Sequence, residues 1–237
     1  MFGFLKNIMN NEESTLITND FNSVHRILKT DFKKDPKPQE DEIIFGCGCF
    51  WGAEKCFWKL PGVVTTSVGY AGGNKSNPTY YEVCTGLTGH SEVVKVIWNK
   101  SQIDISDLLK MFWECHDPTQ KNKQGNDIGT QYRSAIYYKN ENNKNIILAS
   151  KEQYQKNLNK KNKGSIETEI KMIDTYYYAE EYHQQYLASP GSRQYCSASP
   201  TKVKLGSFTG SNYKLKELIW ENFNWEVDKC VLRSDNN

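Results

Sequence analysis

The sequence predicts an α+β fold, a two-layer sandwich in which helices pack on a mixed sheet with a ferredoxin-like core. Strand-like and helix-like segments alternate along the 237 residues, while the longest loops are rich in glycine and polar residues. The excess of Asn and Lys lowers the mean hydropathy without creating a long disordered block. We divide the chain into a polar arm (1–40), a main domain (41–188) and a long irregular C-terminal tail (189–237).

The first elements follow the arm, which ends in a proline-containing, extended segment at 35–38. An apolar run predicts a strand at about 42–46. A helix is expected from about 53 to 60, because the next two residues, Pro61 and Gly62, break helices. The β-branched stretch 63–70 then predicts a second strand.

The middle of the chain contains the clearest periodic patterns. Residues 71–90 lose all periodicity, and a loop of this length in a compact domain is usually functional. Residues 91–98 alternate, with Glu92 on a face that is otherwise apolar, and this predicts a strand. Helical spacing of apolar residues predicts a helix over 106–115 with Ser106 as its N-cap.

The remaining elements are predicted from weaker patterns. They are a polar loop at 119–131, a strand at 132–138, a solvated helix at 144–158, a strand at 168–173, a short helix at 180–187 and a helix near 215–223.

Composition limits the function classes. The balanced charge implies no nucleic acid partner, and no apolar run approaches the ~20 residues of a membrane span. The N-terminus lacks the features of a targeting peptide, so we expect a cytoplasmic monomer, with mitochondria as a weaker alternative. Seven cysteines are scattered rather than arranged as in secreted disulfide frameworks, so each must be argued by position.

Cys49 is the candidate nucleophile. It lies between an apolar strand and a helix, in a turn with glycines at 46, 48 and 52. The unpaired N–H groups and the dipole of a helix start favour an anion, so we expect the pKa of this thiol to be lowered. Phe50 and Trp51 follow directly and would form an apolar wall beside the sulfur.

With these motifs in view, the chain resembles the A-type peptide methionine sulfoxide reductases. The matching segments run in the family's order over most of 45–196. They are GCFWG (48–52), GYAGG (69–73), NPTY (77–80), TGHSE (88–92), HDPT (116–119), GNDIGTQYRS (125–134) and YAEEYHQQYL (178–187).

The chemistry of the residues agrees with the activity that this resemblance implies. A thiolate at Cys49 can attack an electrophilic sulfoxide sulfur and become a sulfenic acid. Glu92 would supply the proton that the leaving oxygen needs, and the resemblance places the family's proton donor there too. The resemblance also implies that Tyr80 and Tyr132 are hydroxyl donors to the oxygen and that Asp127 supports them. Phe50 and Trp51 would then hold the S-methyl group.

Recycling of the sulfenic acid would use a second cysteine. Cys196 lies in a polar segment, and the family often has a resolving thiol there, giving a disulfide that thioredoxin or dithiothreitol reduces without another cofactor. The chain lacks the family's further nearby cysteine, so Cys230 is the candidate second recycling thiol. The resemblance implies reduction of methionine S-sulfoxide, peptide-bound or free, and hence repair of oxidised proteins and peptides.

Three alternative functions remain open on the sequence alone. A Cys–His hydrolase would pair Cys49 with His90, His116 or His183. A non-catalytic protein would bind oxidised methionine segments without turnover. A zinc-binding module would use three thiols and an imidazole, namely Cys47, Cys49, Cys56 and a histidine such as His90. We expect four other cysteines to be structural: Cys47, Cys56, Cys84 and Cys115.

Overall fold

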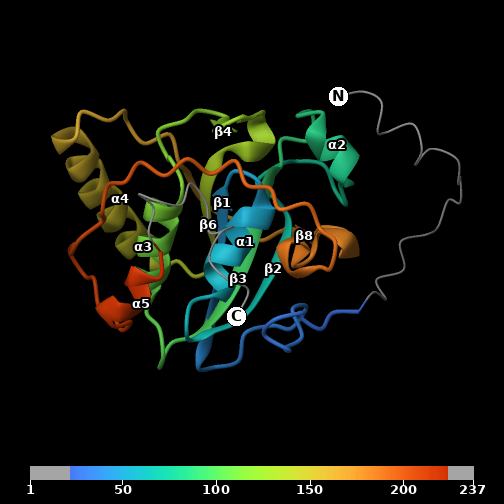
Figure 1. Ribbon diagram of the computed structural model, residues 1–237, viewed down its shortest axis with the longest axis horizontal. Coiled ribbons are helices and arrows are strands. Elements are labelled where there is room, and N and C mark those ends of the chain that lie inside the picture. The colour runs from blue at the N-terminus through green and yellow to red at the C-terminus, as the bar shows by residue number, and fades with distance from the viewer. Residues whose placement is uncertain (1–21, 224–237) are drawn as a thin grey trace, which may run out of the picture.

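A six-stranded sheet with the order β7-β6-β1-β3-β2-β8 forms the centre of the fold (Figure 1). The computed structural model describes residues 22–223. Strands β6 and β7 pair in parallel and the other neighbours are antiparallel, which confirms a mixed sheet in an α+β fold. The strands are β1 (Glu40–Cys47), β2 (Val63–Ala71), β3 (Ser91–Asn99), β6 (Ser134–Tyr138), β7 (Glu169–Met172) and β8 (Tyr176–Tyr178).

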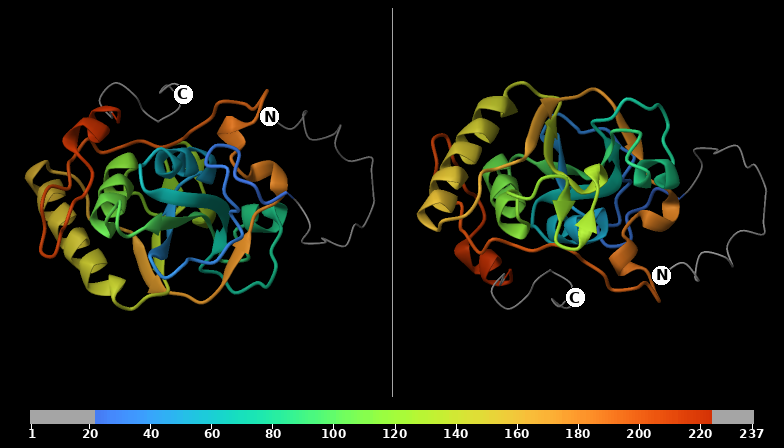
Figure 2. Two further views of the ribbon diagram at one scale, coloured as in Figure 1. Left: turned by 90° about the horizontal axis from the view of Figure 1, so that it is seen from below. Right: turned by 90° about the horizontal axis from the view of Figure 1, so that it is seen from above.

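Helices pack on one face of this sheet, and one of them forms an outer layer (Figure 2). The helices are α1 (Phe50–Trp58), α2 (Tyr80–Cys84), α3 (Ile105–Cys115), α4 (Asn143–Lys160) and α5 (Glu217–Glu221). Helix α4 packs against α3, where Trp113 stacks on Tyr154 with ring centroids 5.4 Å apart. Within residues 22–223, none of the helices is both long enough and apolar enough to cross a bilayer.

The main core lies between the sheet and helices α1 and α3. Phe45 of β1 stacks on Phe57 of α1 at 4.8 Å and on Phe112 of α3 at 5.1 Å. Alternate residues of β3, Val94 and Val96, join this core as predicted, so Glu92 faces it as well. The opposite face of the sheet carries a smaller apolar cluster, made of Ile44, Ala71, Val93, Ala135, Tyr137 and Ile173.

The described parts of the arm and the tail pack against this core. In the arm, His25 and Phe32 are buried. In the tail, Leu205 and Trp220 are buried, and most of the backbone has no regular structure apart from α5. Both ends of the described chain therefore contribute to the packing.

Several predicted boundaries are wrong in instructive ways. Helix α1 begins at Phe50, directly after Cys49, and not at residue 53. Helix α3 is capped by Asp104 rather than Ser106, because Asp104 accepts a hydrogen bond from the N–H of Ser106. The expected helix at 180–187 is two 3₁₀ turns, η3 (Glu181–His183) and η4 (Tyr186–Ala188).

Candidate active site

Cys49 lies in the turn between β1 and α1, where it is the N-cap residue of the helix. Its side chain is only 9% exposed, and its thiol is free. Gly48 has a φ of +91°, and a Cβ atom there would lie 2.6 Å from Cβ of Gln124. Glycine alone fits this approach without displacing the neighbouring chain. The turn therefore holds Cys49 at a helix start and against the hairpin of β4 (Lys123–Gln124) and β5 (Asp127–Ile128).

The surroundings of Cys49 do not favour its thiolate. Burial raises the pKa of the thiol well above its usual value, and the charge of ionised Glu92 adds to the rise. Hydrogen bonds from the N–H groups of Trp51 and Gly52 act in the opposite direction, but burial outweighs them. The expectation that the helix start lowers this pKa is therefore wrong, and the thiol keeps its proton at neutral pH.

Glu92 lies beside Cys49 and is held as a neutral acid. It is 1% exposed, and its Oε2 accepts a hydrogen bond of 3.1 Å from the N–H of Phe50. Burial raises the pKa of this carboxyl to about 8; the Phe50 hydrogen bond opposes the rise and the charge of Asp127 adds to it. At pH 7 the carboxyl therefore carries a proton that it can donate. In this neutral form it does not repel a thiolate at Cys49.

Tyr80, Tyr132 and Asp127 lie close enough to Glu92 to interact with its charge. Burial raises the pKa of both phenols, and the charge of Glu92 adds to each rise, so the hydroxyls remain donors at physiological pH. Asp127 lies on β5, and its Oδ1 accepts a hydrogen bond of 2.6 Å from the hydroxyl of Tyr195. Its Oδ2 is buried and has no hydrogen-bond partner within residues 22–223. Residues separated widely in sequence are thus brought close enough for their charges to interact.

The two aromatic residues after Cys49 form a wall that other residues hold in place. The indole Nε1–H of Trp51 donates to Nδ1 of His183 at 3.1 Å, and the indole stacks on Tyr186 with centroids 3.9 Å apart. Phe50 is buried, and its ring lies 5.1 Å from that of His183. Burial lowers the pKa of His183 to about 4, so this imidazole is neutral. The wall is apolar and rigidly supported.

Glu180 connects the site to the sheet, and the sequence analysis assigned it no role. Its Oε2 accepts a hydrogen bond of 2.8 Å from the hydroxyl of Tyr70 on β2. Its Oε1 accepts one of 2.9 Å from the N–H of Tyr80, the first residue of α2. Glu180 therefore fixes the helix that carries one of the predicted donors. A carboxylate within a tyrosine-rich segment was the sequence signal that could have identified Glu180. The nearby His183 and Tyr186 belong to the same segment.

Cys196 lies in a tail segment that crosses the site. It is disulfide-bonded, whereas Cys49 is free, so the two are not joined to each other. Tyr195 bonds to Asp127, and the N–H of Ser199 donates to Oε1 of Gln124 at 3.0 Å. The chain is thus anchored on the β4–β5 hairpin on both sides of Cys196, at Tyr195 and at Ser199. The predicted second recycling thiol, Cys230, lies outside the described residues.

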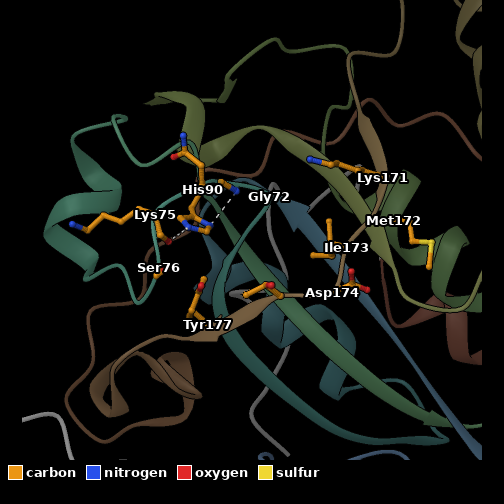
Figure 3. A pocket seen from close by; sticks show the side chains of 12 residues that line it. Gly72, Lys75, Ser76, His90, Lys171, Met172, Ile173, Asp174 and Tyr177 are labelled. Atoms are coloured by element: carbon orange, nitrogen blue, oxygen red, sulfur yellow. Dashed lines mark hydrogen bonds between the residues drawn. The ribbon is translucent and has the colours of Figure 1, made fainter.

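His90 is held by backbone groups of the loop that follows β2. Nδ1 of His90 accepts from the N–H of Gly73, and Nε2 bonds to the carbonyl of Lys75. Figure 3 shows His90 in a separate polar cavity of about 410 Å³, lined by residues 72–76 and 171–175 among others. Within residues 22–223 this imidazole belongs to no group of three or more potential metal ligands within 4.8 Å of one another, so the predicted zinc set is not assembled.

A different group, Cys47, Cys115 and His116, has ligand atoms within 4.8 Å of one another. Nδ1 of His116 bonds to the carbonyl of Phe112 at 2.7 Å, and Nε2 bonds to Ser134 at 2.8 Å. Both ring nitrogens are thus engaged, and a metal would have to displace one of these bonds. Three of the four cysteines expected to be structural are buried, but Cys84 is exposed.

Comparisons with known proteins agree with this geometry. The profile of the peptide methionine sulfoxide reductase family matches residues 41–215. The chain is 51% identical over 180 residues to the peptide methionine sulfoxide reductase MsrA of Vibrio vulnificus, covering 76% of this chain and 86% of that protein. It is 54% identical over 171 residues to MsrA 1 of Synechocystis, covering 72% and 77% of the two chains.

Solved structures give the same relation. The methionine sulfoxide reductase A structure from Corynebacterium diphtheriae has a TM-score of 0.63 and 40% identity, covering 74% of this chain and 89% of that one. Mxr1 of Saccharomyces cerevisiae in reduced form has a TM-score of 0.61 and 34% identity, covering 69% and 92%.

Proposed function

The chain belongs to the peptide methionine sulfoxide reductase family, and from this premise we propose that Cys49 reduces methionine S-sulfoxide to methionine. The reaction is thiol-dependent. The observation that carries the proposal is the pairing of a buried thiol with a carboxyl whose pKa is raised to about 8, joined through the Phe50 N–H. A nucleophile and an acid at one turn suit attack on sulfur with protonation of the departing oxygen.

In the first step the sulfur of Cys49 attacks the sulfoxide sulfur, and the S–O bond of the substrate breaks. The sulfoxide sulfur gains two electrons and leaves as the thioether of methionine. The S–S bond formed in the attack then breaks as the oxygen bonds to the sulfur of Cys49, which thereby loses two electrons and ends as a sulfenic acid. Glu92 delivers a proton to the oxygen as its negative charge develops, and the proton of the Cys49 thiol returns the Glu92 carboxyl to its neutral form.

The neighbouring groups position the substrate. The hydroxyls of Tyr80 and Tyr132 donate hydrogen bonds to the sulfoxide oxygen, and their raised pKa values keep those protons in place. Asp127 orients the polar side of the site through its bond to Tyr195. Phe50 and Trp51 bury the S-methyl group, which contributes binding by dispersion and area burial.

Recycling follows in two exchanges. The Cys196 thiol, in its reduced form, attacks the sulfenic acid of Cys49, so a disulfide forms and water leaves. Thioredoxin then reduces a disulfide on the tail by thiolate attack. Cys230 is the proposed second recycling thiol, which would accept the disulfide from Cys196. No cofactor beyond a dithiol reductant is needed.

The wider predictions remain part of this proposal. The substrates are oxidised proteins and peptides, the partner is thioredoxin, and the protein acts as a cytoplasmic monomer in repair after oxidative stress. The order β6-β1-β3-β2, with α1 and α3 between strands, supports the predicted ferredoxin-like core. Residues 41–188 would carry out the first chemical step, and the tail 189–237 would carry out the recycling. The arm 1–40 would pack against the main domain.

The test is thioredoxin-coupled reduction of the separated S and R epimers of a methionine sulfoxide peptide. The S epimer should be consumed with one methionine formed per disulfide reduced, and the R epimer should not react. The Cys49→Ser variant measures background. Equal consumption of both epimers, or hydrolysis of ester substrates in place of reduction, would contradict the proposal.

A further inference from the structure

Helix α1 carries a buried carboxylate, Glu54, that the proposed chemistry does not use. The side chain is fully buried, and three donors surround it. Its Oε1 accepts from Oγ1 of Thr66 at 2.9 Å and from Nε2 of Gln185 at 2.8 Å, while Oε2 accepts from the N–H of Gln185 at 2.9 Å. Burial raises its pKa to about 7, which these hydrogen bonds oppose.

The arm completes this network at Thr66 of β2, where Nε2 of His25 also lies 4.0 Å from Oε1 of Glu54. Nε2 of His25 bonds to Oγ1 of Thr66 at 2.8 Å, and Nδ1 of His25 accepts from the N–H groups of Ile27 and Leu28. Because Nδ1 accepts, Nε2 carries the proton, so donation runs from His25 to Thr66 and from Thr66 to Glu54. His25 lies outside the 41–215 stretch that the family profile matches.

Gln185 is the point where this network meets the active site. It has a φ of +48°, a left-handed conformation that residues other than glycine adopt rarely, and it joins η3 to η4. Besides its two bonds to Glu54, its Oε1 accepts from the N–H of Arg26 at 3.3 Å. The residues on either side of this turn, His183 and Tyr186, hold the indole of Trp51.

Helix geometry connects the carboxylate of Glu54 with the indole of Trp51. Trp51 and Glu54 are three residues apart on α1 and therefore share a face of the helix. The 183–186 segment runs along that face and is bound at two points, at the indole and at the carboxylate. Burying a carboxylate costs stability even when it accepts hydrogen bonds, so a role in holding the site explains its presence better than packing does.

We propose that Glu54 is a positioning residue for Trp51. It fixes the left-handed turn at Gln185, and through this turn it sets the wall that receives the S-methyl group. Thr66 and His25 hold the carboxylate in turn. The inference rests on the proposed function, because the wall matters only if a methyl sulfoxide binds there.

The test measures single-turnover kinetics of a peptide methionine sulfoxide with Glu54→Gln. The glutamine keeps one acceptor oxygen but turns an NH₂ group toward donors. The apparent KM should rise about tenfold, the usual effect of losing one hydrogen bond to a charged group, with the saturating rate changed by less than about threefold. The matched control is Glu114→Gln, another buried carboxylate, which binds the tail at Leu205 and Lys204; its KM should match the parent.

A second pair keeps the inference testable if Glu54→Gln does not fold. Thr66→Val removes the hydroxyl and should raise KM, whereas Thr66→Ser retains it and should behave as the parent. The fluorescence of Trp51 is obtained by subtracting, for each protein, the spectrum of the same protein with Trp51→Phe. This signal should shift in Glu54→Gln and in Thr66→Val, and in no other protein of the set. An unchanged KM and an unchanged Trp51 signal in the folded variants would overturn the inference. A parent protein that reduces no sulfoxide would instead overturn the proposed function, and the fluorescence comparison would still decide the inference.

Discussion

Replacing Glu92 by glutamine tests the acid that the proposed reaction needs. The change is isosteric, and the remaining carbonyl oxygen can still accept the hydrogen bond of the Phe50 N–H, so the turn should survive. The variant cannot donate the carboxyl proton. The rate of methionine formation in a single turnover at pH 7 should fall by roughly 10²–10⁴-fold, the usual contribution of one positioned acid.

The pH dependence of this effect follows from the raised pKa of Glu92. With a pKa of about 8, the acid form is present below pH 8 and is lost above it. The ratio of the two rates removes most of the titration of Cys49. What remains comes from Glu92 as well, because its charge raises the pKa of that thiol in the parent alone. This ratio should be constant below about pH 7 and should fall about tenfold per pH unit well above pH 8.

Stability gives an independent readout of the same proton. The pKa of Glu92 rises from 4.5 to about 8 on folding, so the folded state binds the proton more tightly than the unfolded state. That stabilisation is fully present below pH 4.5 and is lost as the pH rises through 8. At 1.36 kcal/mol per pKa unit, the difference of about 3.5 units is worth about 5 kcal/mol, an upper figure for a buried group.

The glutamine variant cannot ionise, so it should gain stability over the parent between pH 5 and pH 9. Urea unfolding across this range measures the gain. A rate ratio that does not vary with pH, together with parallel stability curves, would show that Glu92 is ionised at neutral pH. The carboxyl could then not be the proton donor, and the reasoning from its burial would be refuted.

Four further substitutions probe the thiols and the turn. Cys49→Ser should abolish sulfoxide reduction while Cys47→Ser retains most of it; the reverse result would show that the nucleophile is misassigned. Cys196→Ser should release about one methionine per protein and then stall with thioredoxin but turn over with dithiothreitol; full thioredoxin turnover would exclude Cys196 as the main resolving thiol. Gly48→Ala should destabilise the fold by about 1–3 kcal/mol in urea unfolding, because a Cβ meets Gln124 at a φ of +91°; unchanged stability would contradict this.

The regular elements could be predicted because their periods show in the sequence. Alternation over 91–98 predicted β3 and also the face on which Glu92 lies, since a period of two leaves no choice of side once the apolar face is known. The short helix α2 was missed, although Thr79 and Glu82 form a capping box that the sequence pattern contains. A helix of five residues has too few turns to show a period.

The supporting residues of the site could not be predicted in the same way. His183 and Tyr186 come from 3₁₀ turns, whose spacing carries no amphipathic signal. The bond from Trp51 to His183 spans 132 residues, so it depends on the finished fold rather than on local sequence. The expectation of a lowered pKa for Cys49 was wrong for a related reason. The helix start was predicted from local sequence, but the burial that outweighs it is a tertiary effect.

The burial of Cys49 also explains why the proposed enzyme needs a second thiol. With 9% of its side chain exposed, Cys49 offers a partner protein little surface for disulfide exchange. Cys196 lies between two anchors on the hairpin beside Gly48, the Tyr195 hydroxyl on Asp127 and the Ser199 N–H on Gln124. Only the few residues between these anchors would have to rearrange for Cys196 to reach the sulfenic acid. In the proposed cycle an oxidised Cys196 would present its disulfide to thioredoxin from the tail, while Cys49 stays covered.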